Sequence, residues 1–546
     1  MQWVQDYDPT GWTVTSVLLS ALPIALLLTA IAVFRVRTHV AALLALGCAL
    51  LIAVTGFGMP VPLATGAAAF GAAYGLLPIG WLLLNILFLY QLTLRSGAFA
   101  MLQREIVAIT PDRRLQLLLI AFGFGAFFEG CAGFGAPVAI TGAMLAGLGF
   151  SPIAAARLSL IANTAPVAFG SLGTPIIALS AVTGLPLHDL SAMVGRQLPF
   201  FSMLIPFWLI LAFAGWRAMV EIWPAIAVAG ISFAVPQYLV SNFHGPWLVD
   251  IVSASCSIGS LALFLRWWHP ERPWKEQSEE NPSGYQRPEQ TTALPAFYAW
   301  LPWLILCGGV VIWGLPGTRA ALDALFSLRL ALPGLDQMVV RMPPVVPVPE
   351  PESMAFSFNI LSATGTGILL SALVAGLALR IGMREMIGIY GATIRLARLP
   401  LLTIATMLAL GYVTRYSGAD SILGLTLAKT GMFYPFFGTF LGWLGVAATG
   451  SDTASNVLFG GLQKTSAEQL GISPVLMAAA NSTGGVMGKM ADAQSIVVAA
   501  TATGIAGKET EILRYVLFHS IALAGLVALF VLGQAYLWPL NLMVVG

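Results

Sequence analysis

The sequences FFEGCAGFGAP at residues 127–137 and NSTGGVMGKMADAQ at residues 481–494 decide the fold. Each places at least one charged residue among glycines and small side chains in the middle of a long apolar block. Two further blocks have similar centres, NTAPVAFGSLGTP at residues 163–175 and TGSDTASN at residues 449–456. Non-helical backbone inside a bilayer is tolerated only where it lines a cavity or is buried in protein. We therefore expect four helix breaks that are shielded from lipid.

The composition around these blocks is typical of a polytopic helical membrane protein. The chain has 546 residues, of which 9% are charged and 58% are hydrophobic. A soluble enzyme, a disordered protein or a nucleic-acid binder would need far more polar surface. The apolar runs are long and unbroken rather than alternating, which excludes a β-barrel. The four cysteines and five histidines show no metal-binding spacing, so we expect no metal ion and no cofactor.

The basic residues set the predicted orientation, because short cytoplasmic loops are enriched in Lys and Arg. One choice puts the arginine clusters at residues 95–114 and 380–398, and the polar stretch at residues 266–290, on the cytoplasmic side. The proline-rich segment MPPVVPVPEPE at residues 342–352 then lies outside, as do both chain termini. Ordinary spans and two broken ones satisfy this parity, so we predict an all-α membrane protein with about 12 crossings.

Two parts of the chain, residues 115–187 and 417–507, each have room for a re-entrant hairpin followed by one broken helix. GFSP at residues 149–152 in the first part matches GISP at residues 471–474 in the second. The first part starts from the cytoplasm and the second from outside, so we predict two inverted repeats, which are typical of secondary transporters. The predicted organisation is N-terminal spans (1–114), first transport repeat (115–187), scaffold spans (188–266), cytoplasmic polar loop (267–295), scaffold spans (296–416) with an external Pro-rich loop (316–355), second transport repeat (417–507) and C-terminal span (508–546).

Charged residues in the breaks are candidates for a transport site, because a charge inside the bilayer costs at least about 2.5–3.5 kcal/mol. Lys489 is the only lysine in the four breaks, and we predict that it binds a carboxylate, with help from the free amides of half-helices. A single cation favours a monoanion. Small polar side chains would bind the remaining oxygens of the substrate: Asn163, Thr164, Ser171, Thr174, Ser451, Asn481, Ser482 and Thr483.

Asp452 has no basic neighbour in sequence, and we predict that it loads and releases a proton. Glu129 and Asp492 are the further candidates for proton coupling. Structural alternatives stay open for each charge. Lys489 and Asp492, three residues apart, could be an ion pair that holds the break, and Glu129 could cap its own hairpin. Arg157 could reach the cytoplasmic interface, and the glycines could serve close helix packing.

The four motifs together resemble the bacterial lactate permease family. The similarity extends to WVQDYDPTGW at residues 3–12 and GLLPIGWLLLNILFLYQLT at residues 75–93. The resemblance implies proton-coupled import of L-lactate, with D-lactate and glycolate as further substrates, across a bacterial inner membrane. It also implies membership of the wider ion-transporter superfamily, whose members use an elevator-like motion. ANT at residues 162–164 and NST at residues 481–483 are similar to signatures of that superfamily, in permuted order.

Three other functions remain open at this point. The chain could carry another small organic anion, such as a dicarboxylate or gluconate. It could be a channel, because Gly-rich re-entrant loops also build selectivity filters, although buried charges in inverted repeats favour a carrier. It could be an intramembrane aspartyl enzyme, with Asp452 in GSD and Asp492 as its partner. We expect a transporter and not an enzyme, with a small monocarboxylate, protons and the lipid bilayer as partners and no nucleic acid.

Overall fold

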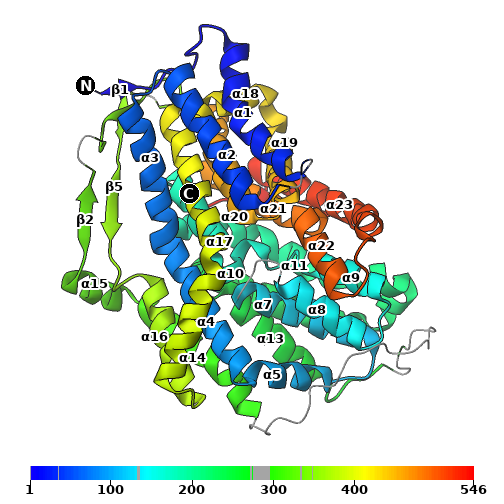
Figure 1. Cartoon of the computed structure of the whole chain (residues 1–546). Helices are drawn as coiled ribbons and strands as arrows, with labels where there is room; N and C mark the ends of the chain where they lie inside the picture. Colours follow the sequence, from blue (N-terminus) through cyan, green and yellow to red (C-terminus); the bar gives the residue numbers. More distant parts are fainter. Residues whose placement is uncertain are drawn as a thin grey trace.

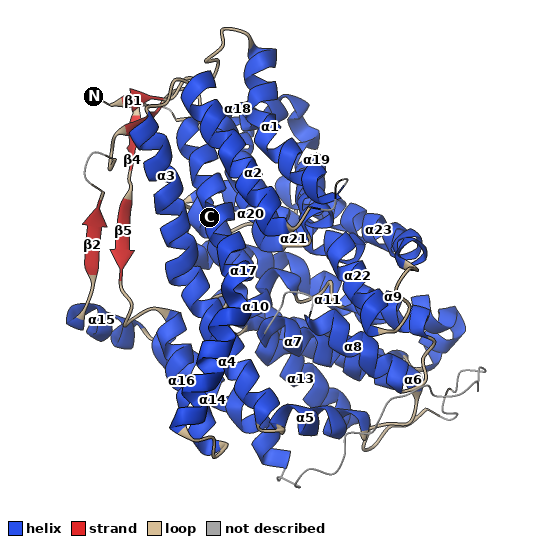
Figure 2. Cartoon of the chain, viewed as in Figure 1, coloured by secondary structure: helices blue, strands red, loops and turns tan. Residues whose placement is uncertain are grey.

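The computed structural model describes residues 2–32, 34, 36–131, 136–270, 274, 296–332, 335–346 and 348–545. Helices dominate the described chain, and the few strands lie at one edge (Figure 2). Most of the predicted cytoplasmic loop (267–295) and residues 132–135 of the first predicted break lie outside the described residues.

The N-terminal helices lead into the first of two long helices that run the length of the molecule (Figure 1). The helices are α1 (Thr13–Ala32), α2 (Thr38–Leu51), η1 (Ile52–Gly56), α3 (Val61–Tyr74), η2 (Gly75–Gly80), α4 (Trp81–Arg95) and α5 (Ala98–Val107). The π-helical η2 joins α3 and α4 into one helix of 35 residues. It packs against the equally long α17 (Met383–Ser417).

The first predicted repeat forms a run of short helices. They are α6 (Arg113–Leu117), η3 (Leu118–Phe124), α7 (Gly125–Cys131), α8 (Ala136–Gly147), α9 (Pro152–Ala162), η4 (Val167–Phe169) and α10 (Gly170–Thr183). The α9 and α10 axes differ by 65°. Ser171, Leu172 and Gly173 have φ values of 45°, 56° and 76°, so three successive residues adopt the left-handed conformation at the start of α10. Such backbone is costly for non-glycine residues and clusters at functional sites.

The middle of the chain contains long spans and a small β structure, most of it in the segment that is predicted to form the external loop. The helices are α11 (Leu187–Glu221), α12 (Trp223–Phe243), α13 (Val249–Phe264), α14 (Ala296–Gly314), α15 (Pro316–Leu325) and α16 (Thr364–Ala378). The strands are β1 (Trp3–Val4), β2 (Leu328–Ala331), β3 (Val339–Arg341), β4 (Glu350–Glu352) and β5 (Ala355–Phe358). One sheet has the order β1-β3-β4, with β1 parallel to β3, and β2 pairs with β5. The N-terminus is therefore tied to the predicted Pro-rich loop.

The second predicted repeat and the C-terminus complete the bundle. The elements are α18 (Ala419–Leu427), η5 (Ala428–Phe433), α19 (Tyr434–Thr449), α20 (Asp452–Leu470), α21 (Pro474–Gly488), η6 (Lys489–Ala491), α22 (Ala493–Ala502), α23 (Glu509–Tyr536) and η7 (Leu540–Met543). Gly450, with φ 73°, ends α19, and Ser451 caps α20 by accepting a hydrogen bond from the Ala454 N–H at 3.2 Å. Asp492 is extended and caps α22 through the Ser495 N–H at 2.7 Å.

Within the described residues, nine helices are long and apolar enough to cross a membrane, or up to eleven if each of two bent helix pairs is one span. Many large apolar side chains on the outer helix faces are exposed, such as Leu18, Phe243 and Phe518. That surface suits lipid, because the same side chains in water would leave large apolar patches. The predicted all-helical, multi-pass membrane protein is confirmed, while the 12 crossings, the inverted repeats and the orientation stay predictions.

Candidate functional site

Lys489 joins two of the helix breaks. Lys489 lies in the α21–α22 break, and its ammonium donates a hydrogen bond at 2.5 Å to the carbonyl of Gly450 in the α19–α20 break. It also lies 3.5 Å from Asp492 Oδ2. Lys489 is 7% exposed and Asp492 1%. The predicted i,i+3 ion pair therefore forms, and in this arrangement it shares Lys489 with a backbone carbonyl.

Asp452 lies beside Lys489, at the first position of α20. Its Oδ2 accepts hydrogen bonds from Ser482 Oγ at 2.5 Å and from Asn456 Nδ2 at 3.3 Å. Its Oδ1 is buried and has no hydrogen-bond partner. A Cβ at Gly485 would come within 2.5 Å of that Oδ1, so α21 approaches the carboxylate as closely as a glycine allows. The helix N-terminus and two donors favour the charged form, whereas burial favours the protonated form.

A chain of amide side chains extends from Asp452 into the core. Asn481 Nδ2 donates to Asn456 Oδ1 at 3.0 Å, and Gln463 Nε2 donates to Asn481 Oδ1 at 3.1 Å. Asn456 Nδ2 also donates to the Pro175 carbonyl of α10 at 3.2 Å. The second predicted repeat is thus bonded to the first at its helix break. Asn456 and Gln463 were not among the predicted site residues, although Asn456 lies in the TGSDTASN motif.

Glu129 brings the first hairpin to the same region. It is 5% exposed, and its Oε1 would lie 2.8 Å from a Cβ at Gly170, so it packs on the start of α10. It lies within electrostatic reach of Lys489 and Asp492. Glu129 Oε2 has no hydrogen-bond partner, nor has either amide atom of the buried Asn163. These polar atoms without a hydrogen-bond partner lie where the sequence predicts substrate or proton binding.

The predicted hydroxyl ligands are mostly engaged within their own helices. Thr164 donates to the Ile161 carbonyl at 2.5 Å and Thr174 to the Ser171 carbonyl at 2.7 Å. Thr483 Oγ1 donates to Gln197 Oε1 at 2.9 Å, Ser482 binds Asp452, and Ser451 is a helix cap. Ser171 is buried in the left-handed turn. All the predicted site residues except the half-buried Ser451 are therefore buried at or beside a break, and Asn163, next to Glu129, makes no side-chain hydrogen bond within the distance and angle of a normal one.

Arg157 lies apart from this cluster. Its guanidinium is 2.9 Å from Glu511 and lies 4.6 Å from the centre of the Tyr515 ring. Arg157 thus pairs with α23 and not with a residue of the breaks, and its predicted reach to the cytoplasmic interface stays a prediction. Among the described residues, no three His, Cys, Asp or Glu side chains converge on a position for a metal ion.

Asp250, in the first turn of α13, is an acidic residue that the sequence reasoning did not single out. It is 1% exposed and neither carboxylate oxygen has a hydrogen-bond partner. A Cβ at Gly130 would come within 2.8 Å of the Asp250 Cβ, so α13 touches the first hairpin next to Glu129. The signal was present, because Asp250 is a charge within the predicted scaffold spans at residues 188–266.

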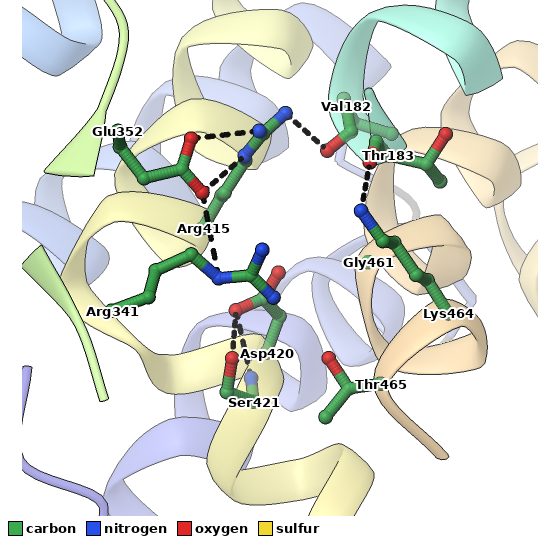
Figure 3. Close-up of a pocket in the computed structure, with 10 residues that line it drawn as sticks. All are labelled: Val182, Thr183, Arg341, Glu352, Arg415, Asp420, Ser421, Gly461, Lys464 and Thr465. Carbon is green, nitrogen blue, oxygen red and sulfur yellow. Dashed lines mark hydrogen bonds and ion pairs between the residues drawn. The ribbon is translucent and has the colours of Figure 1, made fainter. Parts of the chain in front are cut away.

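A second polar cluster surrounds a cavity of about 20 Å³ where α10, α17, α20 and β4 meet (Figure 3). Arg415 lies 2.8 Å from Glu352 and Arg341 lies 3.5 Å from it. Burial alone would raise the pKa of Glu352, but Arg415 and Arg341 outweigh burial and hold that pKa below its usual value. Arg415 donates to the Val182 carbonyl at 3.0 Å and Lys464 to the Thr183 carbonyl at 3.0 Å. Cations thus cap the C-terminus of α10, where the helix dipole is negative. The cavity has room for a single water molecule and is too small for an organic anion.

Comparisons with known proteins agree along the whole chain. The profile of a family described as L-lactate permease matches residues 16–538. The chain is 46% identical to the glycolate permease GlcA of Escherichia coli K12, with 98% of each chain covered. It is 44% identical to the L-lactate permease of Bacillus subtilis 168, over 98% of this chain and 99% of that one. Among solved structures, the YdaH transporter of Alcanivorax borkumensis aligns over 88% of each chain, with a TM-score of 0.43 and 16% identity.

Proposed function

Because the chain belongs to the L-lactate permease family, and is thus a permease rather than an enzyme, we propose that it imports L-lactate and glycolate, and also D-lactate, across a bacterial inner membrane. The observation that carries the proposal is the convergence of helix breaks on the single buried ammonium of Lys489. A carboxylate needs a cation and N–H donors in a site shielded from water. The substrates share a carboxylate with a neighbouring hydroxyl group, for which Asn163 has an unused amide.

We propose that the substrate anion enters together with a proton. Lys489 faces three buried carboxyl groups, Asp492 at 3.5 Å and Glu129 and Asp452 within electrostatic reach. A monocarboxylate would add one more negative charge to a site that already has an excess of acids. Uncompensated charge is costly in a buried site, and protonation of an acid is the cheapest way to remove it. Asp452 is the first candidate for that proton because its Oδ1 is buried without a partner, and Glu129 and Asp492 follow.

We further propose that the two hairpin and broken-helix units are inverted repeats that move together, as in an elevator mechanism. Support comes from two breaks at corresponding places, between α9 and α10 and between α21 and α22, in the helices that follow the matching GFSP and GISP motifs. The hydrogen bond from Asn456 to the Pro175 carbonyl fastens one unit to the other. The long helices α3–α4 and α17 would belong to the stationary scaffold. The proposal needs no cofactor beyond the proton gradient.

The test is uptake of labelled L-lactate by the purified protein in proteoliposomes. We expect saturable uptake that an inward proton gradient accelerates, that a protonophore abolishes, and that unlabelled glycolate and D-lactate inhibit. Uptake that ignores the pH gradient would refute proton symport. Stronger inhibition by a dicarboxylate or gluconate than by lactate would instead favour another organic anion as the substrate. Flux without saturation would indicate a channel.

A further inference from the structure

Asp250 has no structural partner that explains its burial. It lies on α13, 1% exposed, and both of its oxygens lack a hydrogen-bond donor. The most favourable structural role for a buried aspartate is to accept hydrogen bonds or to pair with a cation, and Asp250 does neither. A buried polar group that costs stability without local compensation points to a function.

The neighbour of Asp250 is another buried acid. Gly130, the residue after Glu129, packs so closely on α13 that an added Cβ would lie 2.8 Å from the Asp250 Cβ and 3.1 Å from Ile251 Cγ1. Asp250 and Glu129 are within electrostatic reach of each other. Each of the two carboxyl groups has at least one oxygen that accepts no hydrogen bond, and neither side-chain amide atom of Asn163, beside Glu129, makes one. Two carboxyl groups in this position cannot both be ionised without strong repulsion.

The groups that surround the pair leave the acids short of positive charge. On α7 the other titratable group near Asp250 is the buried Cys131 thiol. The elements η3 and α10, which also pack on α13, carry no titratable side chain, and Tyr238 of α12 is exposed. On the Glu129 side the charged neighbours are Lys489 and Asp492, and these two already pair with each other.

We propose that Asp250 is a proton-coupling residue that carries a proton in one part of the transport cycle and releases it in another, with Glu129 as the neighbouring acid that senses its charge. One oxygen of the Asp250 carboxylate takes up the proton to form an O–H group, which removes the charge repulsion between Asp250 and Glu129. When the site opens to the opposite side, that O–H bond breaks and the proton returns to water. The inference rests on the proposed proton symport, and it adds a proton site where a scaffold helix packs on the first repeat to the one at Asp452 in the second repeat.

The experiment compares two activities of the wild type and Asp250→Asn in proteoliposomes. One is exchange of labelled lactate at equal pH and equal lactate on both sides, and the other is accumulation driven by a pH gradient. Asparagine has the shape of the protonated acid but cannot release a proton. We expect exchange to continue, gradient-driven accumulation to fall at least about fivefold, and the dependence of uptake on external pH to flatten. Asp189→Asn, in the first turn of α11 and partly exposed, is the matched control and should leave both activities unchanged.

Glu129→Gln provides an independent test if Asp250→Asn does not fold. Because the charge of Glu129 acts on Asp250, Glu129→Gln must change the dependence of accumulation on external pH, and adding Glu129→Gln to Asp250→Asn must cause no further loss of accumulation. Wild-type accumulation and pH dependence in either single variant would overturn the proposal, since Asp250 would then be permanently protonated or Glu129 independent of it. If the wild type itself fails to accumulate lactate with the gradient, the proposed symport fails, which is a different result.

Discussion

Lys489 offers the sharpest test, because a structural ion pair and a substrate site predict different results for the same variants. Lys489→Ala removes the cation 3.5 Å from Asp492 and the donor to the Gly450 carbonyl. Breaking a buried pair by removing one partner costs about 3–5 kcal/mol of stability. If the ammonium also binds the substrate carboxylate, losing one charge-assisted hydrogen bond of about 1.5–3 kcal/mol weakens lactate binding by about 10- to 150-fold.

The double variant Lys489→Ala with Asp492→Asn separates the two effects. It removes both charges, and asparagine can still cap α22 as Asp492 does for the Ser495 N–H. We expect the double variant to recover most of the lost thermal stability, because neither charge of the Lys489–Asp492 pair remains buried without the other, and to remain unable to bind lactate.

The assays are calorimetric titration of lactate into the purified protein and thermal unfolding followed by size-exclusion chromatography. Lys429→Ala, at an exposed position in η5, is the control and should behave as wild type in both. Recovery of lactate affinity in the double variant would refute the reasoning and assign Lys489 to a purely structural pair.

Three further predictions concern other parts of the structure. Asp452→Asn should make lactate uptake insensitive to external pH while exchange continues, as measured in proteoliposomes; unchanged pH dependence would move the proton away from this residue. Gly173→Ala should prevent recovery of folded protein on size-exclusion chromatography, because its φ is 76° and an added Cβ would lie 2.5 Å from Pro246; a monodisperse, stable variant would contradict the geometry. The pKa of Glu352 is lowered in the folded protein. Its contribution to the free energy of unfolding is therefore fully present above the usual pKa of glutamate, and it is lost as the pH falls through the pKa of the folded state. Glu352→Gln should therefore lower the stability measured by thermal unfolding at pH 7 by about 1–3 kcal/mol, because the pair with Arg415 is lost. The difference in stability from the wild type should shrink only in acid. An equal difference at pH 3 would contradict this prediction.

The breaks could be predicted from the sequence where glycine or a capping residue sets them. Gly450 and Ser451 end one helix and start the next, and Asp492 caps α22, in motifs that are polar and glycine-rich. The left-handed turn could not be predicted in detail, because Ser171 and Leu172 have no intrinsic preference for positive φ and only the surrounding packing holds them there.

The site was predicted as a set of residues but not as a set of contacts. Glu129 and Lys489 are 360 positions apart, and only the fold shows that they reach each other. The local hydrogen bonds could not be predicted either. Thr164 and Thr174 have hydroxyl groups that could bind a substrate, yet they donate to nearby backbone carbonyls. Asp250 was missed because no glycine or polar neighbour marks it, although the cost of a charge in an apolar span applies to it as much as to Glu129.

The packing of α10 on α20 would let two units so far apart in sequence move as one body, as the proposed elevator mechanism requires. Asn456 bonds to the Pro175 carbonyl and Lys464 bonds to the Thr183 carbonyl. Midway between them, a Cβ at Gly460 would lie 2.8 Å from Leu179 Cδ1, so the helices touch there. The contacts recur every four residues on both helices, as parallel helices in register require. The middle contact needs glycine for close approach, and the outer two are polar bonds that a sliding motion would break. In the proposed elevator motion, a displacement of α20 would therefore carry α10, and with it the break that holds Asn163 and the left-handed turn.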